Sequence, residues 1–290
     1  MWLTFALISA FFASASSILE KKILLKEHAL EFSSILAFCT FLISIPLFLL
    51  FDHNPVPGTI PLLIITIIAI LGGTAFLSIS KSVRHMEISE VSPLITISPA
   101  IAAILGYVFL GESLTLPQIV GIGIIIIGVY ILELKDRTHP LLPFKAIYES
   151  KYIHLIFFAL LLYGITDVLG KLVLTKYNLQ PTAVLFYYQL FLALFFFIVV
   201  SLRKKVSVER AQVIKKNIPL IIIIALLVIA YRYTHLSAVK LANIGITLAV
   251  LRSSTLITTF IGGRLYKEEG LARKSIAALA VILGIVLVAL

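Results

Sequence analysis

The chain has 290 residues, of which 60% are hydrophobic and 13% are charged, and its mean hydropathy is +1.11. A soluble globular domain is about half apolar and a quarter charged, so this composition excludes an ordinary soluble protein and indicates a membrane protein. The net charge of +10 does not predict nucleic-acid binding, because the Lys and Arg residues fall between apolar runs, where basic residues flank membrane spans.

Ten apolar segments are predicted to be transmembrane helices of the length that crosses a bilayer. Membrane barrel strands alternate apolar and polar residues over about ten positions, whereas these runs are continuous. We therefore predict an all-α integral membrane protein of the cell membrane, a multi-pass bundle of ten transmembrane helices surrounded by the lipid bilayer. In chain order the segments are Trp2–Leu19, Phe32–Phe51, Ile60–Ser80, Val91–Leu110, Leu114–Leu132, Tyr152–Gly170, Gln180–Leu202, Ile218–Tyr233, Asn243–Gly263 and Ser275–Leu290.

Short features recur in the same order in the two halves of the chain. A lysine followed by apolar residues comes after the first and sixth segments, at Lys22 and Lys171, and Ile-Pro-Leu opens the third and eighth. A glutamate separates the last two segments of each half, at Glu112 and Glu268. Because five is odd, the second half must be inverted in the membrane relative to the first. We predict a first five-helix repeat over residues 1–134, an inter-repeat loop over 135–151 and a second repeat over 152–290.

The region around Glu112 carries a pattern that is found in a known family. Pro99 precedes Glu112 by thirteen positions, the sequence Leu-Gly-Glu-Ser-Leu-Thr surrounds the glutamate, and Gly121 and Gly128 follow in the next segment. This pattern resembles the EamA-type half of the drug/metabolite transporter superfamily, and the five-plus-five plan matches over the full length. The second half departs from the pattern at the proline and at the turn glycine. The resemblance implies a ten-helix transporter, and it does not choose among the amino acids, drugs, sugars and other metabolites that the family carries.

Several of these residues also have expected structural roles. Gly121 and Gly128 lie seven residues apart on one face of a helix, which favours close helix packing. Glu112 is expected to cap the start of the segment that follows it, because a carboxylate is stabilised at the positive end of a helix. Lys171, near the end of the sixth segment, is expected to extend its ammonium to the membrane surface.

Three ionisable residues fall inside the predicted membrane segments: Asp167, Arg232 and Arg252. Charged side chains at membrane depth are costly and usually face a functional cavity. Asp167, the one acid that we place at this depth, can pair with one arginine as a structural ion pair. The other arginine is then left for an anion. We predict that Arg252, or Arg232, binds a carboxylate or phosphate group of the substrate.

Tyrosines near the same depth complete the predicted site. Aromatic rings can line a pocket while their hydroxyls find partners. Tyr187 and Tyr188 are instead expected to pack or to face lipid, and His235 to be a solvated group near a helix end. The predicted substrate-binding residues are Arg252, Arg232, Asp167, Tyr163, Tyr231 and Tyr233.

The leading functional hypothesis is a secondary transporter that exports or exchanges a small metabolite by alternating access, with an anionic or carboxylate-bearing solute as the candidate substrate. The alternatives are an exporter of cationic drugs that uses Asp167, and a membrane scaffold subunit. An acid midway along the first helix, which small multidrug exporters require, is not expected because Glu20 falls at the predicted helix end. No catalytic residue, metal site or cofactor is predicted, because the sequence has no HExxH, GxSxG or GxxxxGK[ST] motif. Monomer and homodimer both stay open.

The orientation in the membrane is left open by two conflicting indications. Nineteen Lys and Arg residues fall in the connections that follow the odd-numbered segments, and three in the others. This distribution predicts that both termini lie outside. The family resemblance implies that both termini lie inside.

Overall fold

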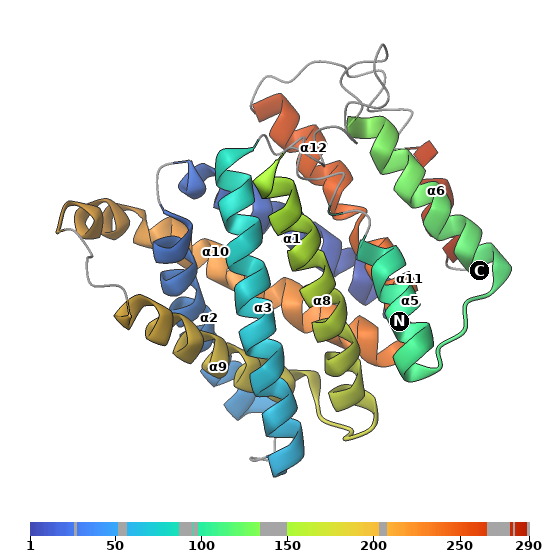
Figure 1. Ribbon diagram of the computed structural model, residues 1–290, viewed down its shortest axis with the longest axis horizontal. Coiled ribbons are helices and arrows are strands. Elements are labelled where there is room, and N and C mark those ends of the chain that lie inside the picture. Colours follow the sequence, from blue (N-terminus) through green and yellow to red (C-terminus); the bar gives the residue numbers. More distant parts are fainter. Residues whose placement is uncertain are drawn as a thin grey trace.

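The computed structural model describes residues 1–25, 28–51, 57–86, 95, 98–133, 150–202, 208–265, 279–280 and 282–288, and these residues form a bundle of helices and short connections (Figure 1). A last helical stretch covers residues 282–288. In chain order the named helices are α1 (Trp2–Leu24), α2 (Ala29–Phe51), α3 (Thr59–His85), α5 (Ser98–Leu110), α6 (Leu116–Glu133), α8 (Lys151–Thr175), α9 (Pro181–Ser201), α10 (Val208–Leu241), α11 (Ile244–Leu251) and α12 (Ser254–Leu265).

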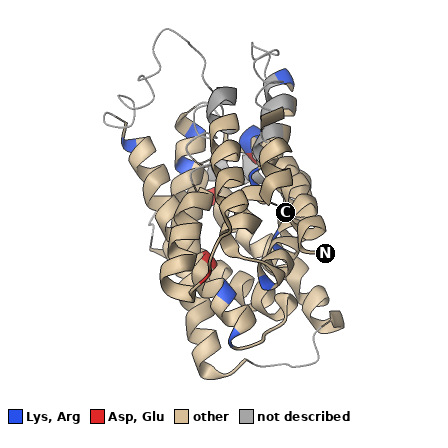
Figure 2. Cartoon of the chain, turned by 90° about the vertical axis from the view of Figure 1, so that its right-hand side faces the viewer, with Lys and Arg blue, Asp and Glu red and all other residues tan. Residues whose placement is uncertain are grey.

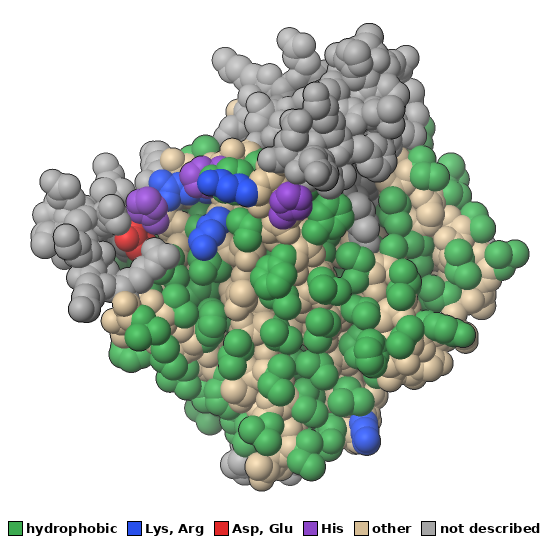
Figure 3. Space-filling view, in the orientation of Figure 1, with side chains coloured by type: hydrophobic (Ala, Val, Ile, Leu, Met, Phe, Trp, Pro, Cys, Tyr) green, Lys and Arg blue, Asp and Glu red, His purple; other side chains and the backbone are tan. Residues whose placement is uncertain are grey.

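The outer surface of the bundle is suited to lipid. Six helices in the described part of the chain are long and apolar enough to cross a membrane, namely α1, α2, α3, α8, α9 and the Asn217–Leu241 part of α10. Hydrophobic side chains cover most of the face seen in Figure 3, with Lys, Arg and His side chains gathered along one rim. Figure 2 likewise shows few charged residues along the bundle and more Lys and Arg toward one end. The chain is therefore an integral, multi-pass membrane protein, as predicted.

The predicted ninth segment is interrupted. α11 ends at Leu251 and α12 begins at Ser254, so Arg252 and Ser253 form a short turn between two helices. The Arg252 N–H donates to the Leu248 carbonyl at 2.9 Å, and the Ser253 N–H donates to the Val250 carbonyl at 3.0 Å. Arg252 thus lies at a helix break, and not inside one continuous helix as the sequence predicted.

Helices from the two halves of the chain pack against each other throughout the bundle. α1 lies along α10, α3 lies along α8, and α2 packs against α9. α5 packs against α8 and α11, while α1 also packs against α11 and α12. The buried apolar side chains that hold these helices together include Ile65, Phe196 and Leu248. This arrangement places polar residues of α1, α8 and α10 around one interior space.

α6 and the last helical stretch cross at two glycines. A Cβ atom on Gly121 would lie 2.8 Å from the carbonyl oxygen of Gly284, and a Cβ atom on Gly284 would lie 2.8 Å from that of Gly121. Two helices approach this closely only where neither carries a side chain at the crossing point. The packing role predicted for Gly121 is confirmed.

Replacing Gly121 with Leu should therefore lower the stability of the protein by about 1–3 kcal/mol, because the new side chain would be forced into a helix backbone. Gly123→Leu in the same helix is the matched control, since a Cβ atom there would meet nothing within 4 Å. Thermal unfolding in detergent compares the two variants. Equal midpoints would contradict the close crossing at Gly121.

Candidate functional site

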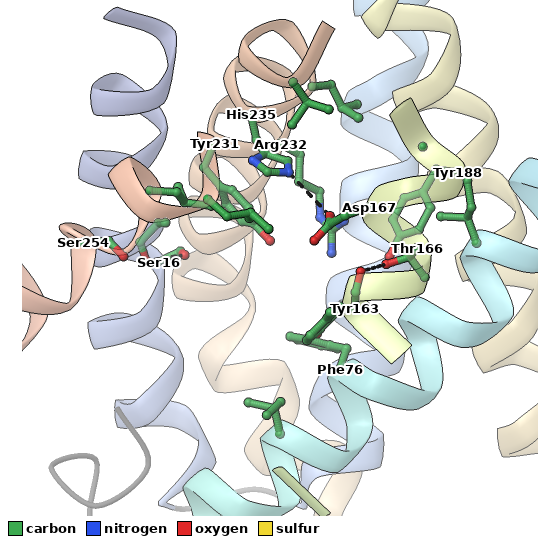
Figure 4. A pocket seen from close by; sticks show the side chains of 18 of the residues that line it. Ser16, Phe76, Tyr163, Thr166, Asp167, Tyr188, Tyr231, Arg232, His235 and Ser254 are labelled. Atoms are coloured by element: carbon green, nitrogen blue, oxygen red, sulfur yellow. Dashed lines mark hydrogen bonds and ion pairs between the residues drawn. The ribbon is translucent and has the colours of Figure 1, made fainter. Parts of the chain in front are cut away.

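A cavity of about 290 Å³ lies among α1, α3, α8, α9, α10 and the break between α11 and α12. Five of the six predicted site residues line it, and Figure 4 shows several of them pointing into the same space. The sixth, Tyr233, lies outside the set of described residues that line the cavity. Residues two apart on a helix differ in direction by about 200°, so Tyr231 and Tyr233 cannot both face one side of α10. The lining residues among the six are Arg252, Arg232, Asp167, Tyr163 and Tyr231.

The cavity is also lined by three residues for which the sequence predicted other positions: Glu20, His235 and Tyr188. α1 continues past its predicted end at Leu19 to Leu24, so Glu20 lies within the helix and lines the cavity. Asp167 is therefore not the one acid at this depth. α10 continues past its predicted end to Leu241, which places His235 in the cavity with 15% of its side chain exposed. Tyr188 also lines the cavity and is buried, and it does not face lipid.

Arg252 is held at the helix break by a contact with α5. Its Nε donates a hydrogen bond to the Ser98 hydroxyl at 2.7 Å, and the charge of Asp167 attracts it. The break is also tied to α1, because the Ser14 hydroxyl donates to the Ser254 carbonyl at 2.8 Å. Arg252 is the C-cap residue of α11 and precedes the first turn of α12, so the negative end of one helix and the positive end of the next meet at this turn.

Arg232, which also lines the cavity, is stacked between aromatic rings. The guanidinium carbon lies 4.7 Å from the ring centre of Tyr188 and 5.6 Å from that of Tyr231, which is the range of cation–π contacts. The charge of Arg232 attracts the Glu20 carboxylate. Gly72 leaves room for this stack, because a Cβ atom there would lie 2.8 Å from the Tyr188 hydroxyl.

A smaller cavity of about 20 Å³ continues from the main one between α2, α9 and α10. Glu20 and Arg232 line both cavities. Three buried polar atoms here have no hydrogen-bond partner among the described residues: Ser33 Oγ, Gln189 Nε2 and Arg232 Nε. A cavity of this size that is lined by polar atoms has room for a single water molecule.

Asp167 faces His235 across the cavity (Figure 4). The Asp167 Oδ1 atom lies 3.7 Å from Nε2 of His235, and the two side chains are 21% and 15% exposed. The Nδ1 atom of His235 is buried without a hydrogen-bond partner among the residues that the structure describes. Asp167, which the sequence predicts beside an arginine, thus also lies near His235, and a histidine can carry a proton.

Glu112 and Lys171 form a partly buried ion pair that neither prediction for them included. Their side chains are 10% and 12% exposed, and the Lys171 ammonium donates to the Glu112 carboxylate. The Glu112 Oε2 atom accepts a hydrogen bond from the Ile244 N–H at 3.0 Å, so Glu112 caps α11 and not the helix that follows it in sequence. The carboxylate does lie at a helix N-terminus, as physical chemistry favours, but the helix is α11, which is far from Glu112 in the sequence.

Tyr188→Leu should destabilise the protein by about 1 kcal/mol more than Tyr188→Phe does, because phenylalanine keeps an aromatic ring under the Arg232 guanidinium and leucine does not. The same two substitutions in an Arg232→Met background provide the control, since the ring then has no cation to bind. Denaturant unfolding in detergent measures all four variants. A difference of the same size in the Arg232→Met background would contradict the cation–π contact.

Comparison with known proteins bears on the first half of the chain and on the fold. Residues 1–134 match the model of the EamA-like transporter family. An uncharacterised protein of Methanocaldococcus jannaschii is 50% identical over 48 residues, which are 17% of this chain and 35% of that protein. The chain thus spans about a third of the length of this curated relative.

Another protein, whose crystal structure has been solved, has a similar fold. The TM-score is 0.69 at 10% sequence identity, and the likeness covers 99% of this chain and 98% of the other. At this identity the likeness concerns the fold alone. The resemblance that the sequence indicated is confirmed for residues 1–134 of this multi-pass membrane protein, which match the model of the EamA-like transporter family.

Proposed function

We propose that the protein is a secondary transporter of a small metabolite in the cell membrane, and that an anionic group of the substrate binds between Arg252 and Arg232. The observation that carries this proposal is the convergence of two arginines on one cavity inside a bundle of apolar helices. The EamA-like first half supports transport as the activity. The cavity volume of about 290 Å³ is near the lower end of the range for ligand sites, which favours a small solute over a large drug.

The two arginines keep binding capacity although acids lie nearby. A guanidinium offers five N–H donors in a fixed plane, which matches carboxylate and phosphate oxygens. Both arginines line the cavity, and Arg252 lies in the turn between α11 and α12. An anion placed between them would have two charge-assisted contacts.

Export of a cationic drug is a second candidate, and Glu20 favours it. With Asp167 it gives the cavity two carboxylates where the sequence predicted one. A cation could bind between them as an anion could bind between the arginines. The size of the cavity argues against large cations.

We also propose that the two halves are inverted repeats that carry out alternating access. If a two-fold axis in the membrane plane relates the halves, α1 corresponds to α8 and α3 corresponds to α10. The contact between α1 and α10 then has its counterpart in the contact between α8 and α3, and the bundle has both contacts. Two lysines support the same exchange. Lys21 donates to the Met86 carbonyl just after α3, and Lys171 donates to the Ala242 carbonyl just after α10. Lys21, rather than the predicted Lys22, is then the counterpart of Lys171.

Thermal stabilisation across a panel of metabolites tests the anion site. The purified protein is heated in detergent with amino acids, carboxylates, sugar phosphates, nucleobases and cationic drugs. A ligand at 100 times its dissociation constant should stabilise the fold by about 2.7 kcal/mol. We expect stabilisation by carboxylates or phosphates. Stabilisation by cationic drugs alone would contradict the arginine site and favour Glu20 and Asp167.

A further inference from the structure

We propose that Glu112 and Lys171 form a gate that closes the cavity at the end of the bundle where α8 and α10 terminate. This inference rests on the proposed transport function. Lys171 lines the cavity, and the Glu112 carboxylate with which it pairs lies on the turn that follows α5. α8 ends at Thr175, four residues after Lys171, which is about 6 Å along the helix. The pair therefore lies between the solute cavity and the end of the bundle.

The contacts of this pair join segments from both halves of the chain. Lys171 Nζ donates to the Ala242 carbonyl at 2.8 Å as well as to Glu112. The second carboxylate oxygen of Glu112 accepts from the Ile244 N–H at 3.0 Å. Beside them, the Asn243 side chain donates to the Ser113 carbonyl at 2.9 Å. One turn of the first half is thus fastened to α8 and to the α10–α11 turn of the second half.

Glycines allow the glutamate to reach this position. Gly111, immediately before it, has a φ of +66°, a backbone conformation that other residues adopt at a cost. A Cβ atom on Gly106 would lie 2.9 Å from Glu112 Oε2, so the absence of a side chain there makes space for the carboxylate. The turn is shaped to hold Glu112 against α8 and α11.

An ion pair of this kind suits a gate because it can be stable in two states. While the two side chains are largely shielded from water, their mutual attraction and the hydrogen bonds to Ala242 and Ile244 compensate for lost hydration. If the two halves separate at this end, water enters and hydrates both charges, so breaking the contact costs little. An apolar seal would instead expose apolar surface to water on opening.

Labelling of a cysteine in the cavity tests the gate without any substrate. Cys39→Ser removes the one native cysteine, and Ser17→Cys then places a thiol on α1 at the cavity wall. The membrane-impermeant reagents MTSET, a cation, and MTSES, an anion, are applied from each side in right-side-out and inverted vesicles. We expect Glu112→Gln to raise the labelling rate from one side by on the order of tenfold with both reagents. Lys176→Gln, at the exposed end of α8, is the control and should leave the rate unchanged.

The conservative variant Lys171→Arg guards against a simple loss of folding. It should label as slowly as the parent, because a guanidinium can donate to both Glu112 and the Ala242 carbonyl as the ammonium does. Unchanged labelling in Glu112→Gln would overturn the gate. So would rate changes of opposite sign for the two reagents, which indicate only an altered field, or fast labelling of Lys171→Arg. If the metabolite panel gives no stabilising anion, the substrate proposal fails while this labelling result stands by itself.

Discussion

Replacing Arg252 with Gln should weaken anion binding by at least about 100-fold, the loss expected when two hydrogen bonds to a charged group are removed. Arg252 lines the cavity at the start of α12, and its guanidinium is positioned by the hydrogen bond to Ser98. Glutamine fits a similar space but has neither the charge nor the planar fork of donors. The measurement is a titration of the best-stabilising anion of the metabolite panel against wild type and variant.

Two controls separate the role of the guanidinium from general effects. Arg252→Lys keeps the charge and loses the bidentate geometry, so its affinity should fall between those of wild type and Arg252→Gln. Arg264→Gln removes an exposed arginine near the end of α12 and should bind the anion normally. Equal anion affinity in Arg252→Gln and Arg264→Gln would contradict the assignment of Arg252 to the site.

Replacing Arg232 with Met should lower the free energy of unfolding by about 3 kcal/mol, since it removes the cation that offsets a carboxylate inside the bundle. The charge left behind is Glu20, which lines the same two cavities and is attracted by Arg232. Methionine has a similar length and keeps the apolar stem. Denaturant unfolding in detergent at one fixed pH gives the comparison.

The double variant Glu20→Gln/Arg232→Met identifies the cause of this loss. Removing both charges should recover most of the stability, because a buried pair often contributes little in total although each partner needs the other. A double variant that is as unstable as Arg232→Met alone would show that Arg232 acts through packing on Tyr188 and not through Glu20.

The positions of the membrane helices could be predicted from hydropathy, but their ends could not. Hydropathy averages over all faces of a helix, so the predicted helices stop where polar residues begin. Glu20 and His235 follow such apolar runs, and the helices nevertheless continue, because both side chains face an interior cavity rather than lipid. This difference explains why the sequence predicts Asp167 in the cavity but does not predict Glu20 and His235 there.

The arginines and Asp167 could be assigned to one site because charge inside an apolar segment is conspicuous in a sequence. The partners of Glu112 could not, since a local capping rule points to the next helix and the observed partner, Ile244, lies 132 positions away. The break at Arg252 was also missed. Helix breaks are predicted from Pro and Gly, and the residues at this turn are Arg252 and Ser253.

Efflux from loaded liposomes tests the central claim most directly. Liposomes that contain the protein are filled with an equimolar mixture of carboxylates, sugar phosphates, amino acids, nucleobases and cationic drugs, and mass spectrometry follows which compounds leave. Wild type should deplete one or more anionic members, and Arg252→Gln and protein-free liposomes should retain them. Retention of the whole mixture by wild type, or loss of cationic members alone, would contradict transport of an anion through this cavity.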